Sequence, residues 1–224
     1  MSVWARIREA VAALARGDGL AAVLDRLRTP PERQVAFTIA VIALGAKMAK
    51  ADGRVTRNEV AAFREVFSIP RHAEASAASL FNYARQDVAG FEAYAAQVAG
   101  MFGPGSPMLE NLLYGLFHIA LADGDYHPDE DEFLRRCAAI FGLEGRPFER
   151  LLAHFVPEQA ACWDVLGLDP SASDEAIRRR WRELVRETHP DRLLAAGMPE
   201  ESVRLATARL ARINRAYESI MEQR

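Results

Sequence analysis

The chain has 224 residues, of which 50% are hydrophobic and 26% are charged, and its formal net charge is −3. This length and composition are typical of one large or two small globular domains. The slight acidic balance argues against a nucleic-acid-binding protein, which would carry a basic excess. No sequence pattern indicates a bound cofactor, so none is expected.

Residues 1–30 are predicted to form an amphipathic helical segment, not a signal peptide or a membrane anchor. Their apolar side chains recur at helical spacing, at Trp4, Ile7, Val11 and Leu14. Charged residues interrupt the segment early, and the longest apolar run of the chain, 35–46, is shorter than the roughly 20 residues of a transmembrane helix. We expect this segment to pack on the next domain or on a partner, with attachment to a membrane surface as the less favoured alternative. A cytoplasmic protein without a transmembrane segment is predicted.

An internal repeat lies within residues 31–154. The stretch Ala49–Val55, followed by Glu59, recurs as Ala120–Tyr126, followed by Glu130. Each copy follows a helix that is apolar on nearly all sides, and such helices are normally buried. The helices predicted in this region are 35–49, 73–86, 88–102 and 109–121, with an amphipathic helix after each copy of the repeat. A duplicated helical domain with two buried central helices is therefore expected.

The repeated pattern Ala-x-Ala-Asp-Gly, at 49–53 and 120–124, resembles the two halves of the TerB-like (tellurite-resistance) domain. The resemblance implies that residues 31–154 form a TerB-like helical bundle.

The acidic residues of the repeat raise the question of a metal site. An Asp-Gly pair with a glutamate six residues later copies the second half of a calcium-binding EF-hand loop, but the positions before it lack oxygen ligands. Helix ends and capping boxes explain the same residues, so we assign no metal. Pseudo-symmetry could still gather four weak candidate ligands: Asp52, Glu59, Asp123 and Glu130. The histidines at 72, 118, 127 and 154 show no metal-ligand spacing.

Residues 155–224 are predicted to form a short helix followed by a helical hairpin. An arginine-rich amphipathic helix runs from about Asp174 to Glu187, and a second amphipathic helix reaches the C-terminus. Between them lies the triplet His189-Pro190-Asp191, hereafter the triplet. Pro190 disfavours a helical conformation for the residue before it, so the first helix must end at the triplet and expose it.

This region resembles the J-domain of DnaJ-type co-chaperones. The matching segments are Trp163–Leu168, Ile177 with Trp181 to Leu184, the triplet with Arg192, and Ile213-Asn214 with Ala216-Tyr217. Three positions depart from the usual pattern, Arg180, Trp181 and Thr188, and none of them belongs to the triplet. The loop at 193–199 looks like that of the DjlA subfamily, which also places a TerB-like domain before its J-domain. The two resemblances therefore support each other.

A J-domain docks on an ATP-bound DnaK-type (heat shock protein 70) chaperone and stimulates its ATP hydrolysis. The resemblance implies that His189, Pro190 and Asp191 carry this trigger. It also implies that four arginines, hereafter the arginine face, carry docking: Arg178, Arg179, Arg182 and Arg186. The alternative is a solvated helix face with internal pairs such as Glu175–Arg179. Residues 155–224 are expected to fold and stimulate the chaperone on their own, while the TerB-like domain selects a client, partner or location.

A second class of function stays open, in which the TerB-like domain is a metal- or stress-responsive sensor and the J-domain a tether. An enzyme is not expected, since no nucleophile–base pair or phosphate-binding loop is present. Cys137 and Cys162 are far apart and form no Cys-x-x-Cys pair, so both are predicted to be free thiols on apolar helix faces.

Overall fold

The computed structural model describes residues 3–27, 33–51, 64, 69–86, 90–122, 124, 126–155, 162–199 and 203–224. In these residues the chain forms helices and no strands, which confirms the predicted all-α fold. The helices of the N-terminal part are α1 (Val3–Ala15), α2 (Leu20–Asp25), α3 (Arg33–Ala51), the 3-10 helix η1 (Arg71–Ala73), α5 (Glu74–Gln86) and α6 (Phe91–Phe102). Those that follow are α7 (Pro107–Ala120), α8 (Pro128–Phe141), α9 (Arg146–Leu152), α10 (Cys162–Leu166), α11 (Asp174–Thr188), α12 (Pro190–Ala195) and α13 (Val203–Glu222).

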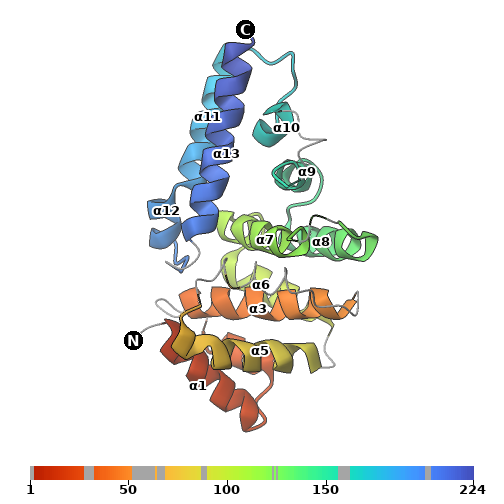
Figure 1. Cartoon of the computed structure of the whole chain (residues 1–224), viewed down its shortest axis with the longest axis vertical. Helices are drawn as coiled ribbons and strands as arrows, with labels where there is room; N and C mark the ends of the chain where they lie inside the picture. Colours follow the sequence, from red (N-terminus) through yellow and green to blue (C-terminus); the bar gives the residue numbers. More distant parts are fainter. Residues whose placement is uncertain are drawn as a thin grey trace.

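Helices α3 and α7 form the centre of the molecule and contact each other. All residues of α3 from Val35 to Ala49 are buried, as are those of α7 from Met108 to Phe117. In Figure 1 these two helices lie in the middle layers, with α5 and α1 below them and the long pair α11 and α13 above. The predicted burial of both helices is therefore confirmed. A helix without a polar face is most stable when neighbouring helices cover all its sides.

The N-terminal helix α1 packs on the rest of the bundle. It contacts α3 and α5, and it buries Trp4, Ile7 and Leu14 there. Of the two alternatives for this segment, packing on the next domain is therefore the observed one. None of the described helices is both long enough and apolar enough to span a lipid bilayer.

Local sequence signals set several helix ends. Ser106 precedes α7, and its Oγ accepts a hydrogen bond from the N–H of Leu109 at 3.4 Å. Pro128 occupies the first turn of α8, which ends at Gly142 with a positive φ of 69°. Ser173 caps α11 in the same way as Ser106 caps α7, with its Oγ accepting from the N–H of Ala176 at 3.3 Å.

Helices α11 and α13 lie side by side as a hairpin and share a small core with α10 (Figure 1). Trp181 of α11 stacks on Tyr217 of α13 with ring centroids 4.5 Å apart, and its indole N–H donates to Oδ1 of Asn214 at 2.9 Å. The buried members of this core, hereafter the hairpin core, are Ala153, Val165, Leu166, Ile177, Leu184, Ile213, Ala216 and Ile220.

The other end of the hairpin belongs to a different core. Leu193, Met198, Leu205 and Ala206 are buried in the large cluster formed by α1 to α9, hereafter the main core. The start of α13 contacts α7. Part of the loop expected after the triplet is helical, because Pro190–Ala195 form α12. The two regions predicted as separate domains therefore share apolar packing beside the triplet.

Candidate functional site

The triplet lies at the sharp bend between α11 and α12. His189 has φ −59° and ψ 127°, an extended conformation that ends α11 as Pro190 requires. The side chains of His189 and Asp191 are 49% and 88% exposed. The backbone N–H of Asp191 donates to Nδ1 of His189 at 3.2 Å, so the imidazole caps α12. In the neutral ring this bond leaves the proton on Nε2, where it can be donated to a partner.

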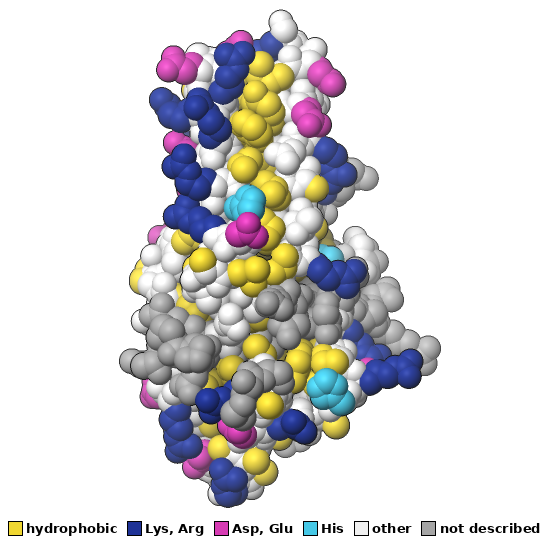
Figure 2. Space-filling model, turned by 90° about the vertical axis from the view of Figure 1, so that its left-hand side faces the viewer, with side chains coloured by type: hydrophobic (Ala, Val, Ile, Leu, Met, Phe, Trp, Pro, Cys, Tyr) yellow, Lys and Arg dark blue, Asp and Glu magenta, His cyan; other side chains and the backbone are white. Residues whose placement is uncertain are grey.

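The arginine face runs along α11 toward the triplet. All four of its side chains are exposed. Figure 2 shows a column of basic side chains down the upper part of the molecule, ending near a histidine and a carboxylate. Of the described residues, no carboxylate forms an ion pair with any of these four arginines. The internal ion pairs of the alternative, such as Glu175–Arg179, are thus not formed. The Nε–H of Arg182 donates to the carbonyl of Arg178 at 3.1 Å, and the four exposed guanidinium groups keep donors for a partner.

An apolar stripe lies beside the basic column in Figure 2. The half-buried side chains of Trp181, Val185 and Tyr217 pack against the hairpin core from the surface. Arg180, one of the three departures from the usual J-domain pattern, has a structural role. Its Nε–H donates to the carbonyl of Leu166 at 3.3 Å, and its guanidinium pairs with Glu183 at 3.2 Å. Arg180 therefore ties α11 to α10 instead of extending the arginine face.

A buried group of charges, which no sequence pattern predicted, joins α13 to α7 and α9. Nη2 of Arg209 lies 2.6 Å from Oε1 of Glu110, and Arg150 of α9 pairs with the same oxygen. Nη1 of Arg209 also donates to Oδ1 of Asn111 at 3.3 Å. The sequence signal was a charged residue on an apolar face, at Glu110 in α7 and at Arg209 in α13. Glu110, Arg150 and Arg209 are hereafter the interdomain ion cluster.

Burial and charge oppose each other at this cluster. Burial alone raises the pKa of Glu110, but the charges of Arg209 and Arg150 and their hydrogen bonds outweigh burial and hold the pKa at about 2. His154 lies beside the cluster, with its ring 5.6 Å from that of Tyr114 and with no hydrogen-bond partner on either nitrogen. Burial, together with the charges of Arg209, Arg212 and Arg150, lowers the pKa of His154 to about 2. The carboxylate is therefore ionised and the imidazole neutral in the folded protein.

The candidate metal ligands Asp52, Glu59 and Asp123 lie outside the described residues. Glu130 is buried at the start of α8, where its Oε2 accepts a hydrogen bond from the N–H of His127 at 3.0 Å. Glu130 therefore caps the start of α8. Among the residues that the structure describes, no three His, Cys, Asp or Glu side chains are grouped as metal ligands. The shared site that pseudo-symmetry could form from these candidates stays untested.

The cysteines are free, as predicted. Cys137 is buried in α8, and burial raises the pKa of its thiol, which disfavours the reactive thiolate. Cys162 is half-buried at the start of α10.

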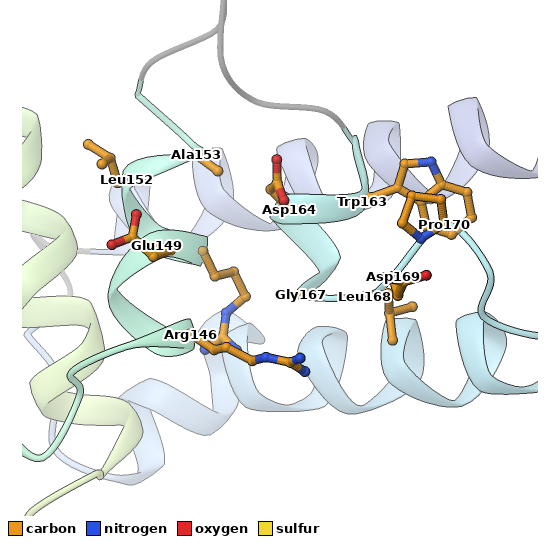
Figure 3. Close-up of a pocket in the computed structure, with 11 residues that line it drawn as sticks. Arg146, Glu149, Leu152, Ala153, Trp163, Asp164, Gly167, Leu168, Asp169 and Pro170 are labelled. Atoms are coloured by element: carbon orange, nitrogen blue, oxygen red, sulfur yellow. The ribbon is translucent and has the colours of Figure 1, made fainter.

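Two clefts border the C-terminal helices. The first, of about 520 Å³, lies between α9 and the segment 163–170; Figure 3 shows Arg146 on one side and Trp163 and Pro170 on the other. Its charged side chains are of mixed sign, and Glu149 and Arg150 pair elsewhere, so it defines no ligand class. The second, of about 540 Å³, lies between α12 and the segment joining α6 to α7.

Comparisons with known proteins agree with this architecture. Residues 38–153 match the family model "Tellurite resistance protein TerB", and residues 161–224 match "DnaJ domain". The chain therefore belongs to the TerB family and carries a DnaJ domain after its TerB domain, the domain order expected of a DjlA-like co-chaperone.

Relatives named "Co-chaperone protein DjlA" resemble the chain over most of its length. The protein of Photobacterium profundum is 27% identical over an alignment of 236 positions, which covers 93% of this chain and 85% of the relative. The protein of Vibrio cholerae is 27% identical, and the alignment covers 86% of this chain and 80% of the relative. The protein of Coxiella burnetii is 28% identical, and the alignment covers 79% of this chain and 73% of the relative. No solved structure gives a significant match. These similarities support a co-chaperone of the J-domain class.

Proposed function

We propose that this protein docks on a DnaK-type chaperone and stimulates its ATP hydrolysis through His189, Pro190 and Asp191. The observation that carries the proposal is the exposed triplet at the end of an arginine face without internal ion pairs. The arginines supply forked, permanently charged donors for an acidic surface of the chaperone. The triplet then contacts the docked chaperone, which performs the hydrolysis itself. In this proposal the chain is not an enzyme and needs no cofactor.

The proposal is tested by the single-turnover ATPase rate of a purified DnaK-type chaperone with the full-length chain. Wild type is expected to raise the rate, and His189→Gln to abolish the increase without changing the melting temperature, because His189 is an exposed bend residue. His127→Gln is the matched control, since His127 is an exposed histidine before α8 in the TerB domain. Equal stimulation by wild type and His189→Gln would refute the trigger.

For the TerB domain we propose the selection of a client, partner or location. The alternative is a metal- or stress-responsive sensor, for which Asp52, Glu59, Asp123 and Glu130 are the weak candidate metal ligands. A calorimetric titration of the full chain with divalent cations separates the two functions, because only a metal-responsive sensor should show binding heat. A cytoplasmic location is part of the proposal, and cell fractionation tests it. No nucleic-acid partner is proposed.

A further inference from the structure

The triplet lies between two cores that hold its two sides. On one side, α11 carries the arginine face and is held by the hairpin core through Ile177 and Leu184. On the other side, α12 begins at Pro190 and is held by the main core through Leu193. The carbonyl of His189 accepts hydrogen bonds from the N–H groups of Arg192 and Leu193, at 3.1 and 3.2 Å, so the triplet follows any movement of α12.

Helix α12 packs on α11 and α13, and its buried side enters the main core. Leu193 is 1% exposed, and Met198 just after the helix is fully buried, both within the main core. The N–H of Met198 donates to the carbonyl of Leu193 at 2.8 Å, which closes this short segment on itself. The cleft beside α12 has Phe102, Pro107 and Met108 of the TerB domain as its other wall. The main core, to which the TerB domain contributes most of the side chains, therefore holds the segment that follows Asp191.

The start of α13 is held on α7 at two levels. Leu205 packs over Gly115, where an added Cβ would lie 3.5 Å from Leu205 Cδ1. One turn further along, Arg209 contacts Glu110 and Asn111. Apolar contacts alone tolerate small shifts of one helix along another. A buried guanidinium that bridges two side chains of α7 does not, because moving it would leave charges unpaired in the interior.

The cluster is better suited to fixing an orientation than to stabilising the fold. Its two guanidinium groups face a single carboxylate, and the Nε atoms of both Arg150 and Arg209 lack hydrogen-bond partners. Replacing buried ion pairs by apolar side chains is often neutral or stabilising, so stability alone does not explain the arrangement. The need to fix the angle between α13 and α7 does explain it.

We propose that Glu110, Arg150 and Arg209 are positioning residues for the triplet, so that the TerB domain forms part of the trigger and does more than select a client. This inference rests on the proposed function. It separates two properties of the chain. Docking strength depends on the arginine face, which the hairpin core holds. Maximal stimulation depends on the orientation of the triplet, which the TerB domain holds through α12 and α13.

The experiment measures single-turnover ATPase stimulation against concentration of the full-length chain, at a temperature where circular dichroism shows every variant folded. Arg209→Met, which removes the guanidinium but keeps an apolar stem, is expected to lower maximal stimulation about fivefold or more while the half-saturating concentration changes less than about twofold. Arg209→Lys keeps a charge against Glu110 but loses the fork, and is expected to be intermediate. Arg215→Met, at an exposed arginine of the same helix, is the matched control.

Amide hydrogen exchange supplies a readout that loss of stability alone would not give. At the same temperature, Arg209→Met is expected to speed exchange at 192–198 while amides of α11 in the hairpin core keep their wild-type rates. If Arg209→Met fails to fold, Arg209→Lys carries the test. Wild-type maximal stimulation by a folded Arg209 variant would overturn the inference. Absence of stimulation by wild type would instead overturn the proposed function, so the two failures are distinguishable.

Discussion

Arg209 on α13 and Glu110 on α7 form a buried ion pair between the DnaJ and TerB domains, with 2.6 Å separating Nη2 from Oε1. The two side chains are 2% and 8% exposed. Neither domain match spans this contact, because Glu110 lies within 38–153 and Arg209 within 161–224. The two domains are thus joined by buried polar contacts as well as by the apolar packing of α12 and α13 in the main core.

Replacing Glu110 is expected to destabilise the whole chain. Glu110→Gln leaves Arg150 and Arg209 buried without a carboxylate, and breaking a buried pair in this way lowers the free energy of unfolding by about 3–5 kcal/mol. Urea unfolding followed by circular dichroism measures the change. The control is Glu149→Gln, whose exposed ion pair with Arg135 is expected to contribute less than about 1 kcal/mol. Equal losses in the two variants would contradict a special role of the buried cluster.

Acid is expected to destabilise the protein in two steps. Between about pH 6.5 and 4.5 the unfolded chain protonates His154, while the folded chain, in which the pKa of His154 is about 2, does not. Below about pH 4.5 the unfolded chain also protonates Glu110, while the folded chain keeps it ionised, because its folded-state pKa is about 2. Both pKa values are lower in the folded state, so both contributions are complete at neutral pH and are lost as pH falls. Each group lowers the free energy of unfolding by up to about 1.4 kcal/mol per pH unit.

The variant His154→Phe isolates the first step. Phenylalanine keeps the aromatic packing against Tyr114 and removes two nitrogens that have no hydrogen-bond partner. Urea unfolding at pH 7.5, 6.0 and 5.0 should therefore show a smaller loss of stability on acidification than in wild type. An unchanged dependence between pH 7.5 and 5.0 would show that His154 is not its source.

Reversal of the arginine face is expected to weaken docking. Arg178→Glu combined with Arg182→Glu should raise the half-saturating concentration about tenfold or more at low salt, and the wild-type value should rise with ionic strength. The matched control is Arg71→Glu with Arg85→Glu, an equal change in net charge at exposed arginines of the TerB domain. If both double variants behave alike, only net charge matters and the arginine face has no specific role.

Gly115 is expected to accept alanine but no larger side chain. A Cβ at this position would lie in ordinary contact with Leu205, so Gly115→Ala should stabilise the protein by up to about 1 kcal/mol through its better helix propensity. Gly115→Leu should push α13 away from α7 and lower the free energy of unfolding by about 1–3 kcal/mol. Thermal melts of the two variants measure these opposite shifts. A stabilising leucine would mean that α13 does not lie close to α7.

A fragment of residues 155–224 tests the dependence of the DnaJ domain on its neighbour. It keeps the hairpin core except Ala153 but exposes Leu193, Met198 and Leu205, which are buried in the full chain. We expect a fragment of low stability that stimulates the chaperone to a lower maximum than the full chain does. A fragment with the full maximum would agree with the sequence-based expectation of independence and would contradict the support by the TerB domain.

Much of the fold follows from local patterns. The burial of α3 and α7 is predictable because neither helix has a polar face, and the bend at the triplet because Pro190 excludes a helical conformation at His189. The serine caps of α7 and α11 follow from hydrogen bonds within three residues of the helix start. The exposure of the arginine face follows from the apolar side chains on the opposite side of α11, Ile177 and Leu184, which face the hairpin core.

The sequence by itself determined most of the helices, the two domain types and the position of the triplet, because these depend on residues within a few turns of one another. Only the tertiary structure decided that Arg209 meets Glu110 and that Leu193 enters the main core. Periodicity shows that a helix face will be buried but does not identify the surface that covers it. Arg209 and its hydrogen-bond partner Asn111 are 98 residues apart, and the contact arises from the packing of α13 on α7. A charged residue on an apolar helix face is the sequence signal of such a long-range contact, since a buried charge is tolerated only when a partner is present.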